Sequence, residues 1–173
     1  VVRLIKDNGL EVIRLSYPDQ HGILRGKTIM AGEIEQALRN GCAITTTLLA
    51  KDTSHTTVFP VFSPGGGFGI PEMENAGDFI AVPVPTTFRL LPWAPGTGWV
   101  LCDGYLANGE PVPFSTRQVL KNAISSLEER GFDYIAGIEV ECHIYRLEDP
   151  MLRPEDAGQP ANPPRVSLIA RGY

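Results

Sequence analysis

Two runs of partly alternating apolar and polar residues near the start of the chain predict a β-hairpin. Residues 11–17 (Glu-Val-Ile-Arg-Leu-Ser-Tyr) alternate in part, and a second β-rich run covers residues 23–30. Between them lies Pro18-Asp19-Gln20-His21-Gly22, whose proline, aspartate and glycine favour a turn. A short helix is expected over residues 32–40, and Gly41 follows it as the usual residue at a helix end.

The middle of the chain gives a weaker pattern. Residues 42–77 lack a clear period and contain the glycine-rich stretch 64–69, which is not followed by Gly-Lys-Ser/Thr and holds no G-x-G-x-x-G. We therefore interpret this stretch as a loop rather than a phosphate-binding cradle. After this loop we expect three short β-like runs, separated by prolines, at residues 79–84, 87–91 and 98–106. A tight turn is expected at Asn108-Gly109.

The clearest helix of the sequence begins at Ser115. Ser115 and Gln118 have the spacing of a capping box, apolar residues recur behind them at helical intervals, and Gly131 ends the run. A strand over 133–145 and a polar, proline-rich loop over 149–164 are predicted to follow. Because one helix and one strand cannot cover each other's apolar faces, we expect this second unit to need further chain or neighbouring molecules.

Composition and charge narrow the function classes. The chain has 173 residues, of which 43% are hydrophobic and 20% charged, and its net charge is −5 without a basic run. This balance predicts a globular protein and argues against nucleic acid or an anionic membrane as the partner. Three scattered cysteines and the lack of an apolar run long enough to span a bilayer predict a cytoplasmic protein with reduced thiols.

The predicted strand carries the best candidate for a metal site. Residues 138–145 have strict period two, so Glu139 and Glu141 share one face with His143 while apolar residues share the other. Two carboxylates about 7 Å apart at their Cα atoms, from a rise of ~3.3 Å per residue, are suited to a hard divalent cation. The same pattern also fits the solvent face of an edge strand, and a His/Glu/Glu transition-metal site is a further alternative.

Asp19 is the second candidate. It is either a simple turn former, whose carboxylate binds nearby backbone N–H groups, or an anionic group at a hairpin tip that faces a cationic ligand. No arrangement of Ser, His and Asp or of Cys and His has the spacing of a nucleophilic catalyst.

Three stretches together resemble the glutamine synthetase family. The hairpin 13–27 is similar to that family's early Asp-x-x-Gly turn between two strands, and residues 99–120 are similar to the junction between its two domains. Gly137-Ile138-Glu139-Val140-Glu141 matches the G-x-E-x-E metal strand, and Arg171-Gly172-Tyr173 is like a motif that precedes further metal ligands. The order and spacing of these stretches agree over nearly the whole chain.

The resemblance implies an α+β fold. An N-terminal β-grasp domain would occupy residues 1–111, and residues 112–173 would begin a glutamine-synthetase-type catalytic domain. Family active sites lie between subunits, so a homo-oligomeric ring is implied for the full-length protein. The remaining metal ligands and the residues that bind ATP and glutamate would lie beyond Tyr173, so that this chain alone is expected to be inactive.

The resemblance also implies a reaction. ATP, as co-substrate, would phosphorylate the γ-carboxylate of glutamate, and ammonia or a small amine would displace the phosphate. Glu139 and Glu141 would each bind Mg²⁺ or Mn²⁺, Asp19 would bind ammonium and take its proton across a subunit interface, and Tyr173 would lie at the ammonium site. Cys142-His143 stands where the family has aromatic residues, which favours a γ-glutamyl-amine synthetase acting on another amine. The alternative from a different class is a non-catalytic β-grasp relative with a binding or structural role.

Overall fold

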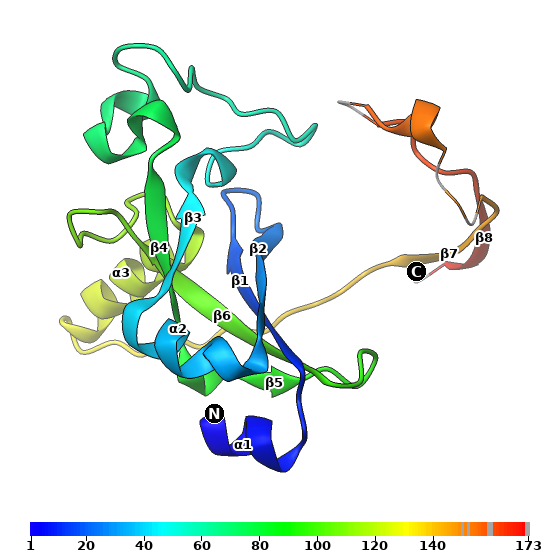
Figure 1. Cartoon of the computed structure of the whole chain (residues 1–173), viewed down its shortest axis with the longest axis horizontal. Coiled ribbons are helices and arrows are strands. Elements are labelled where there is room, and N and C mark those ends of the chain that lie inside the picture. Colours follow the sequence, from blue (N-terminus) through cyan, green and yellow to red (C-terminus); the bar gives the residue numbers. More distant parts are fainter. Residues whose placement is uncertain (150, 152, 159–160, 172–173) are drawn as a thin grey trace.

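The computed structural model describes residues 1–149, 151, 153–158 and 161–171, and within them the fold is mixed α and β (Figure 1). The larger sheet has six strands in the order β2-β1-β6-β4-β3, with β5 paired to β6. Its strands are β1 (Val12–Pro18), β2 (Leu24–Met30), β3 (Cys42–Thr45), β4 (Asp78–Pro83), β5 (Arg89–Leu90) and β6 (Thr97–Tyr105). A second sheet pairs β7 (His143–Leu147) with β8 (Val166–Arg171).

Three α-helices accompany these strands: α1 (Val2–Asp7), α2 (Ile34–Asn40) and α3 (Thr116–Glu128). Short 3-10 helices fill several connections: η1 (Ala31–Glu33), η2 (Thr46–Leu48), η3 (Gly67–Gly69), η4 (Pro71–Ala76), η5 (Pro85–Thr87) and η6 (Pro154–Asp156). None of the helices in the described ranges is both long and apolar enough to cross a membrane.

The predicted hairpin is confirmed. β1 and β2 pair antiparallel from Val12↔Met30 to Pro18↔Leu24. The alternation in β1 buries Ile13, Leu15 and Tyr17 on one face, as expected for a strand that lines a core. On its other side β1 pairs in parallel with β6, which makes β6 the central strand of the sheet.

The hydrophobic core lies between the main sheet and the elements that pack on it. Fully buried side chains from four strands, including Ile13, Ile44, Phe79 and Val100, meet there. Helix α2 packs against β4 and contributes Ile34 and Ala37, and it ends at Gly41 as predicted. Val112 is the last buried residue among those described.

Helix α3 forms where it was predicted, with Ser115 as its N-cap residue, although no side-chain capping hydrogen bond is made. The helix is tied to the sheet by ion pairs from Arg117 and Lys121 to Asp103 on β6. The Arg117 Nε–Asp103 Oδ1 distance is 3.0 Å. Burial alone would raise the pKa of Asp103, but the hydrogen bonds from Lys121 and Arg117 outweigh it and hold the pKa below its usual range.

The prediction of one strand over 133–145 is wrong for most of its length. Only His143–Leu147 is a strand, paired with β8, and residues 133–142 are extended without a partner strand among the described residues. Alternating sequence makes a strand only when a neighbouring strand supplies hydrogen bonds, which explains the difference. The loop predicted over 149–164 lies between β7 and β8, and its described residues include η6.

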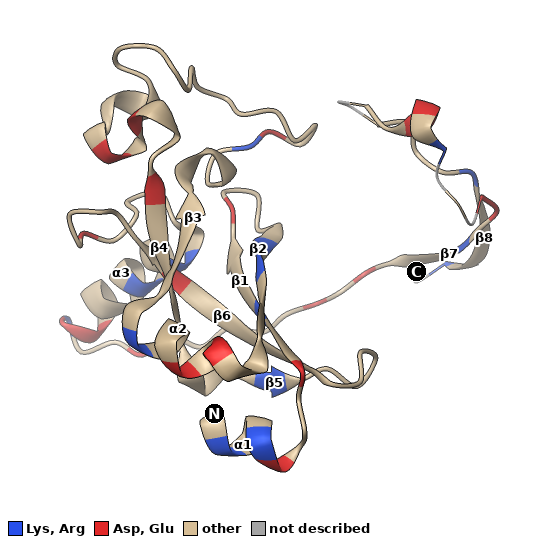
Figure 2. Cartoon of the chain, in the orientation of Figure 1, with Lys and Arg blue, Asp and Glu red and all other residues tan. Residues whose placement is uncertain are grey.

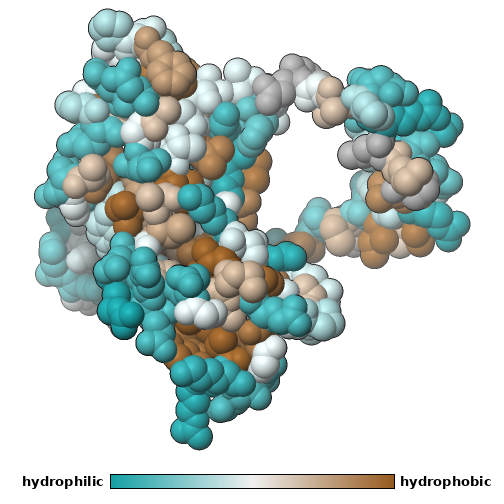
Figure 3. Space-filling model, viewed as in Figure 1, coloured by the Kyte–Doolittle hydropathy of each residue, from teal (hydrophilic) through white to brown (hydrophobic). Residues whose placement is uncertain are grey.

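The region after α3 buries few of its apolar side chains. In Figure 1 the β7–β8 pair stands away from the main sheet at the end of the extended segment, and Figure 3 shows hydrophobic side chains on its surface. Ile135 is 94% exposed and Ile138 is 89% exposed. Such apolar surface, in a region without a buried residue among those described, needs covering by another layer.

Candidate functional site

Asp19 holds together the tip of the β1–β2 hairpin. Its Oδ1 accepts hydrogen bonds from the backbone N–H groups of His21 (2.9 Å) and Ile23 (3.0 Å), and its Oδ2 accepts one from Arg25 Nε at 2.7 Å. The side chain is 0% exposed, and that of Arg25 is 11% exposed. Asp19 therefore forms the turn in the structure, as one of its two interpretations predicted, and it also makes an ion pair with Arg25.

The ionisation of Asp19 is fixed by two opposing effects. Burial raises the pKa, but the hydrogen bonds from Arg25, His21 and Ile23 and the charge of Arg25 together hold the pKa below its usual range. The carboxyl group is thus an anion at neutral pH with both oxygens already occupied. An incoming ammonium group reaches it only after Arg25 moves aside.

The hairpin tip is joined to the segment that follows β3. Arg25 Nη1 lies 2.7 Å from His55 Nδ1, and because arginine can only donate, the ring nitrogen accepts. The side-chain amide of Gln20 donates to the carbonyl of Lys51. Sequence reasoning missed the role of His55 as a partner of Arg25, because thirty positions separate the two residues and no local pattern relates them.

Two hydroxyl groups near this region are buried without a partner among the described residues: Tyr17 Oη and Thr46 Oγ1. The Tyr17 ring packs edge-on against Phe79, with centroids 4.9 Å apart. Burial raises the pKa of Tyr17 above its usual range, with Arg25 opposing the shift and Asp19 adding to it. The phenol is therefore neutral and available only as a hydrogen-bonding group.

Glu139 and Glu141 lie on the exposed, extended segment between α3 and β7, where Figure 2 shows acidic positions along the ribbon. Asp19 directly follows β1 of the main sheet, so the predicted site residues come from different parts of the fold (Figure 1). Tyr173 lies outside the described residues. Within the described part of the chain, no group of three or more His, Cys, Asp or Glu side chains is placed to hold a metal ion.

The donor set of Glu139 and Glu141 fits a hard divalent cation in type but not in number. Both are carboxylates, the ligands that Mg²⁺ and Mn²⁺ prefer, and both are exposed and able to bind. Such ions take about six oxygen ligands. Two glutamates alone would therefore fill only part of such a coordination shell.

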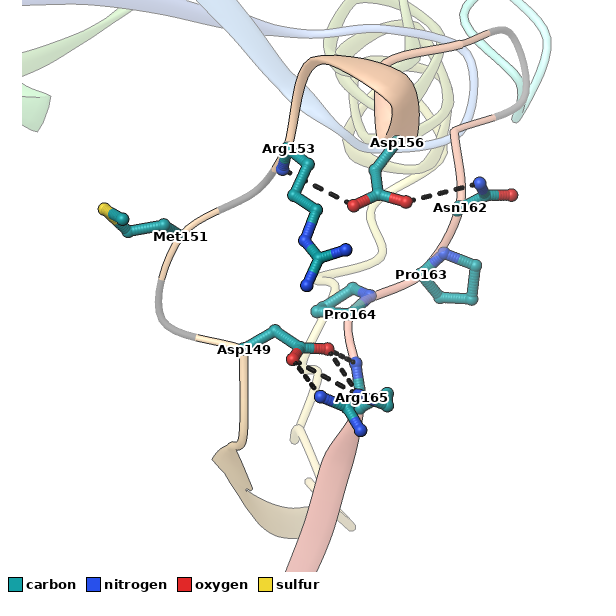
Figure 4. A pocket seen from close by; sticks show the side chains of 8 residues that line it. All are labelled: Asp149, Met151, Arg153, Asp156, Asn162, Pro163, Pro164 and Arg165. Carbon is teal, nitrogen blue, oxygen red and sulfur yellow. Dashed lines mark hydrogen bonds and ion pairs between the residues drawn. The ribbon is translucent and has the colours of Figure 1, made fainter.

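A polar cavity of about 370 Å³ lies in the loop between β7 and β8 (Figure 4). Asp149 accepts hydrogen bonds from Arg165, with an Arg165 Nη2–Asp149 Oδ1 distance of 2.7 Å, and these lower the pKa of Asp149 to about 2. Asp156 accepts from the backbone N–H of Arg153 and from Asn162. These contacts close the loop on itself, and the sequence analysis did not single out any of these residues.

Curated relatives and solved structures are similar to this chain. No protein-family model matches the chain. γ-Glutamylanilide synthase from an Acinetobacter species is 39% identical over 100% of this chain and 36% of the relative. Glutamine synthetase from Methanosarcina mazei is 31% identical over 86% of this chain and 30% of the relative. Glutamate–isopropylamine ligase from a Pseudomonas species is 31% identical over 81% of this chain and 29% of the relative.

Solved structures support the fold. The ligand-free form of GmaS superposes with a TM-score of 0.56 at 24% identity, covering 75% of this chain and 26% of that chain. A glutamine synthase homologue gives a TM-score of 0.53 at 20% identity, covering 70% of this chain and 27% of that chain. The chain spans about a third of the length of the curated relatives it matches. By the relatives that cover it, the chain belongs to the glutamine synthetase family.

Proposed function

We propose that this chain is part of an ATP-dependent ligase that joins glutamate to an amine as a γ-glutamyl amide, through γ-glutamyl phosphate. The observation that carries the proposal is the match with γ-glutamylanilide synthase, which extends over the whole of this chain. A relative named for isopropylamine matches as well, which supports an organic amine as the nucleophile in place of ammonia.

The architecture of the proposed ligase divides the chain in two. Residues 1–111 form the β-grasp domain in this proposal, and residues 112–173 begin the catalytic domain. The distribution of the core supports this division, because every buried residue among those described lies at or before Val112. The uncovered apolar side chains after α3 are those expected of a domain whose other elements are supplied elsewhere.

In this proposal Glu139 and Glu141 are two of the ligands of Mg²⁺ or Mn²⁺. The cation, when bound, neutralises charge on the phosphates and on the transferred phosphoryl group. The glutamates are suited to the role because both are exposed carboxylates at alternate positions of an extended segment. Their Cα atoms are about 7 Å apart at a rise of ~3.3 Å per residue.

The hairpin tip around Asp19 is proposed as the part of the chain that meets the amine, across an interface with the next subunit of a homo-oligomeric ring. Proton transfer to Asp19 itself stays a prediction. Its carboxylate is fully covered and bound to Arg25, so proton transfer requires that this ion pair opens. Until it opens, Asp19 acts by holding the shape of the tip.

The test is the activity of the complete ligase that contains this chain. We expect Glu139→Ala and Glu141→Ala each to lower metal-dependent phosphate release from ATP by about 100-fold or more, since each removes a metal ligand. Asp133→Ala, the same change at an exposed acid of the same segment, is the control and is expected to keep its activity. Full activity in both glutamate variants would favour the non-catalytic alternative.

A further inference from the structure

A second cavity, apolar and open to the surface, lies directly beside the hairpin tip. It has a volume of about 380 Å³ and is lined by Gln20, Ala50, Val58, Phe68 and Phe114. Volumes of roughly 300–1,000 Å³ are typical of sites for small organic molecules. We propose that this pocket holds the aryl group of the amine substrate; the assignment rests on the proposed ligase function.

Aromatic rings form the wall of the pocket. Phe68 packs edge-on against Phe59, with centroids 5.0 Å apart, and against Phe114, with centroids 5.9 Å apart. Phe68 nevertheless keeps 56% of its surface exposed. A ring held on two edges and open on the remaining side is a preformed surface for another aromatic ring.

The backbone at Phe68 adds a second, independent observation. Phe68 has φ +61°, in the left-handed region that bulky residues avoid. The neighbouring Gly67, also left-handed, is packed so closely that a Cβ there would lie 2.6 Å from Met73 Cβ. Strain of this kind persists where the surroundings fix it, and it concentrates at sites that bind or react.

The pocket is attached to the proposed amine site. Gln20 follows Asp19 in the chain and contributes to the lining, while its amide donates to the carbonyl of Lys51 beside Ala50. The contact between Arg25 and His55 ties the same two segments a second time. A molecule in the pocket therefore lies next to the turn that Asp19 organises.

The chemistry of the lining selects the kind of amine. Among the lining residues only Gln20 has a polar side chain, and none is charged. An alkyl ammonium ion would find one neutral acceptor there, Gln20 Oε1, which has no partner among the described residues, but it would find no counter-charge to replace its hydration. An aryl amine is a weak base and is neutral at pH 7, so that it enters with its ring on Phe68 and Phe114 at no such cost.

Binding is tested on the 173-residue chain by following backbone amide signals in NMR during titration with aniline. The largest shifts are expected at Ala50, Val58, Phe68 and Phe114, and methylammonium should bind at least about tenfold more weakly. Phe68→Gly removes the ring and suits the left-handed backbone, and it should weaken aniline binding roughly fivefold. Shifts that gather elsewhere would overturn the proposal.

The matched control is Phe62→Gly, the same change at a ring that is 79% exposed and does not line the pocket. It should leave aniline binding unchanged, and an equal loss in both variants would contradict the assignment. Val58→Glu, at a position 51% exposed, puts a charge at the pocket and should reproduce the effect of Phe68→Gly without touching the glycine-rich turn.

The complete ligase separates this inference from the function on which it rests. Phe68→Gly should raise the KM for aniline about fivefold, whereas Phe62→Gly, outside the pocket lining, should leave that KM unchanged. An equal KM for aniline in the unaltered ligase and in Phe68→Gly would overturn the pocket. If the chain binds aniline here but the ligase joins no amine to glutamate, the aryl-amine pocket is supported and the ligase function is overturned.

Discussion

The main sheet and the region from α3 to β8 use their apolar side chains in opposite ways. In the sheet, Ile13 and Phe79 are 0% exposed, whereas Ile135 and Ile138 beyond α3 are 94% and 89% exposed. Apolar groups gain roughly 25 cal/mol per Å² only when water is removed from them. The difference teaches that the first region carries its own core, and that the described part of the second region depends on contacts it does not itself provide.

The largest effect on stability is expected from the same substitution, Phe to Ala, made once in each region. Phe79→Ala empties a fully buried site against Tyr17, and we expect it to lower the free energy of unfolding by about 4 kcal/mol. Phe132→Ala, at a position 61% exposed, should change it by less than about 0.5 kcal/mol. Urea unfolding followed by tryptophan fluorescence measures both, and equal losses would abolish the distinction.

A second pair compares ion pairs in the two regions. Asp19→Ala leaves Arg25 without its carboxylate partner and two backbone N–H groups unsatisfied, and should cost about 3 kcal/mol. Asp149→Ala breaks the pair with Arg165, whose side chain is 80% exposed, and should leave stability unchanged because water replaces the contact. Thermal unfolding of the two variants measures both losses of stability. An Asp19→Ala protein as stable as the wild type would contradict the difference between the two ion pairs.

The glycine-rich turn gives a third, smaller effect. Gly67→Ala combines a left-handed backbone with a Cβ 2.6 Å from Met73 Cβ, and should cost about 2 kcal/mol. Gly69→Ala has a similar φ but open space around it, so that only the backbone cost of about 1 kcal/mol is expected. Urea unfolding should rank the two variants in this order, and the reverse order would mean that the contact with Met73 is absent.

The smallest effect concerns the junction between the two regions. Asp103→Asn weakens the contacts with Arg117 and Lys121, and we expect hydrogen exchange of the α3 amides to become faster by roughly fivefold, about 1 kcal/mol. The control is Glu128→Gln, which neutralises an exposed acidic side chain on α3.

The same contact predicts a dependence on pH. The pKa of Asp103 is lower in the folded protein than its ordinary value of about 4. Its contribution to the stability of the folded protein is therefore complete above that value and is lost as the pH falls through the folded pKa. In acid, the α3 amides should therefore exchange hydrogen at the same rate in the wild-type and Asp103→Asn proteins. A difference that stays constant down to pH 2 would contradict the assignment.

Local patterns predicted the local parts of the fold. The hairpin, the end of α2 at Gly41 and helix α3 were all indicated by turn residues and periodicity. The parallel pairing of β1 with β6 was not, because the backbone hydrogen bonds that join the two strands leave no mark on either sequence. Helix α1 was missed for a related reason, since only Ile5 of that short segment is buried.

The candidate site was predicted less completely. The turn chemistry of Asp19 could be read from its neighbours, but its pairing with Arg25 follows from the register of the hairpin, which places Tyr17 opposite Arg25. The pocket beside it could not be anticipated. Its walls come from Gln20, Phe68 and Phe114, which only the folded sheet brings to one place.

The central position of β6 has a consequence for synthesis of the protein. β1 and β2 can pair as soon as residue 30 leaves the ribosome, but their parallel neighbour is complete only at Tyr105. At 5–20 residues per second, roughly 4–15 s pass before β6 is complete, and during this time the edge of β1 that pairs with β6 is unpaired. An unpaired edge is open to other nascent chains, so the time of greatest risk of aggregation ends when β6 is inserted between β1 and β4.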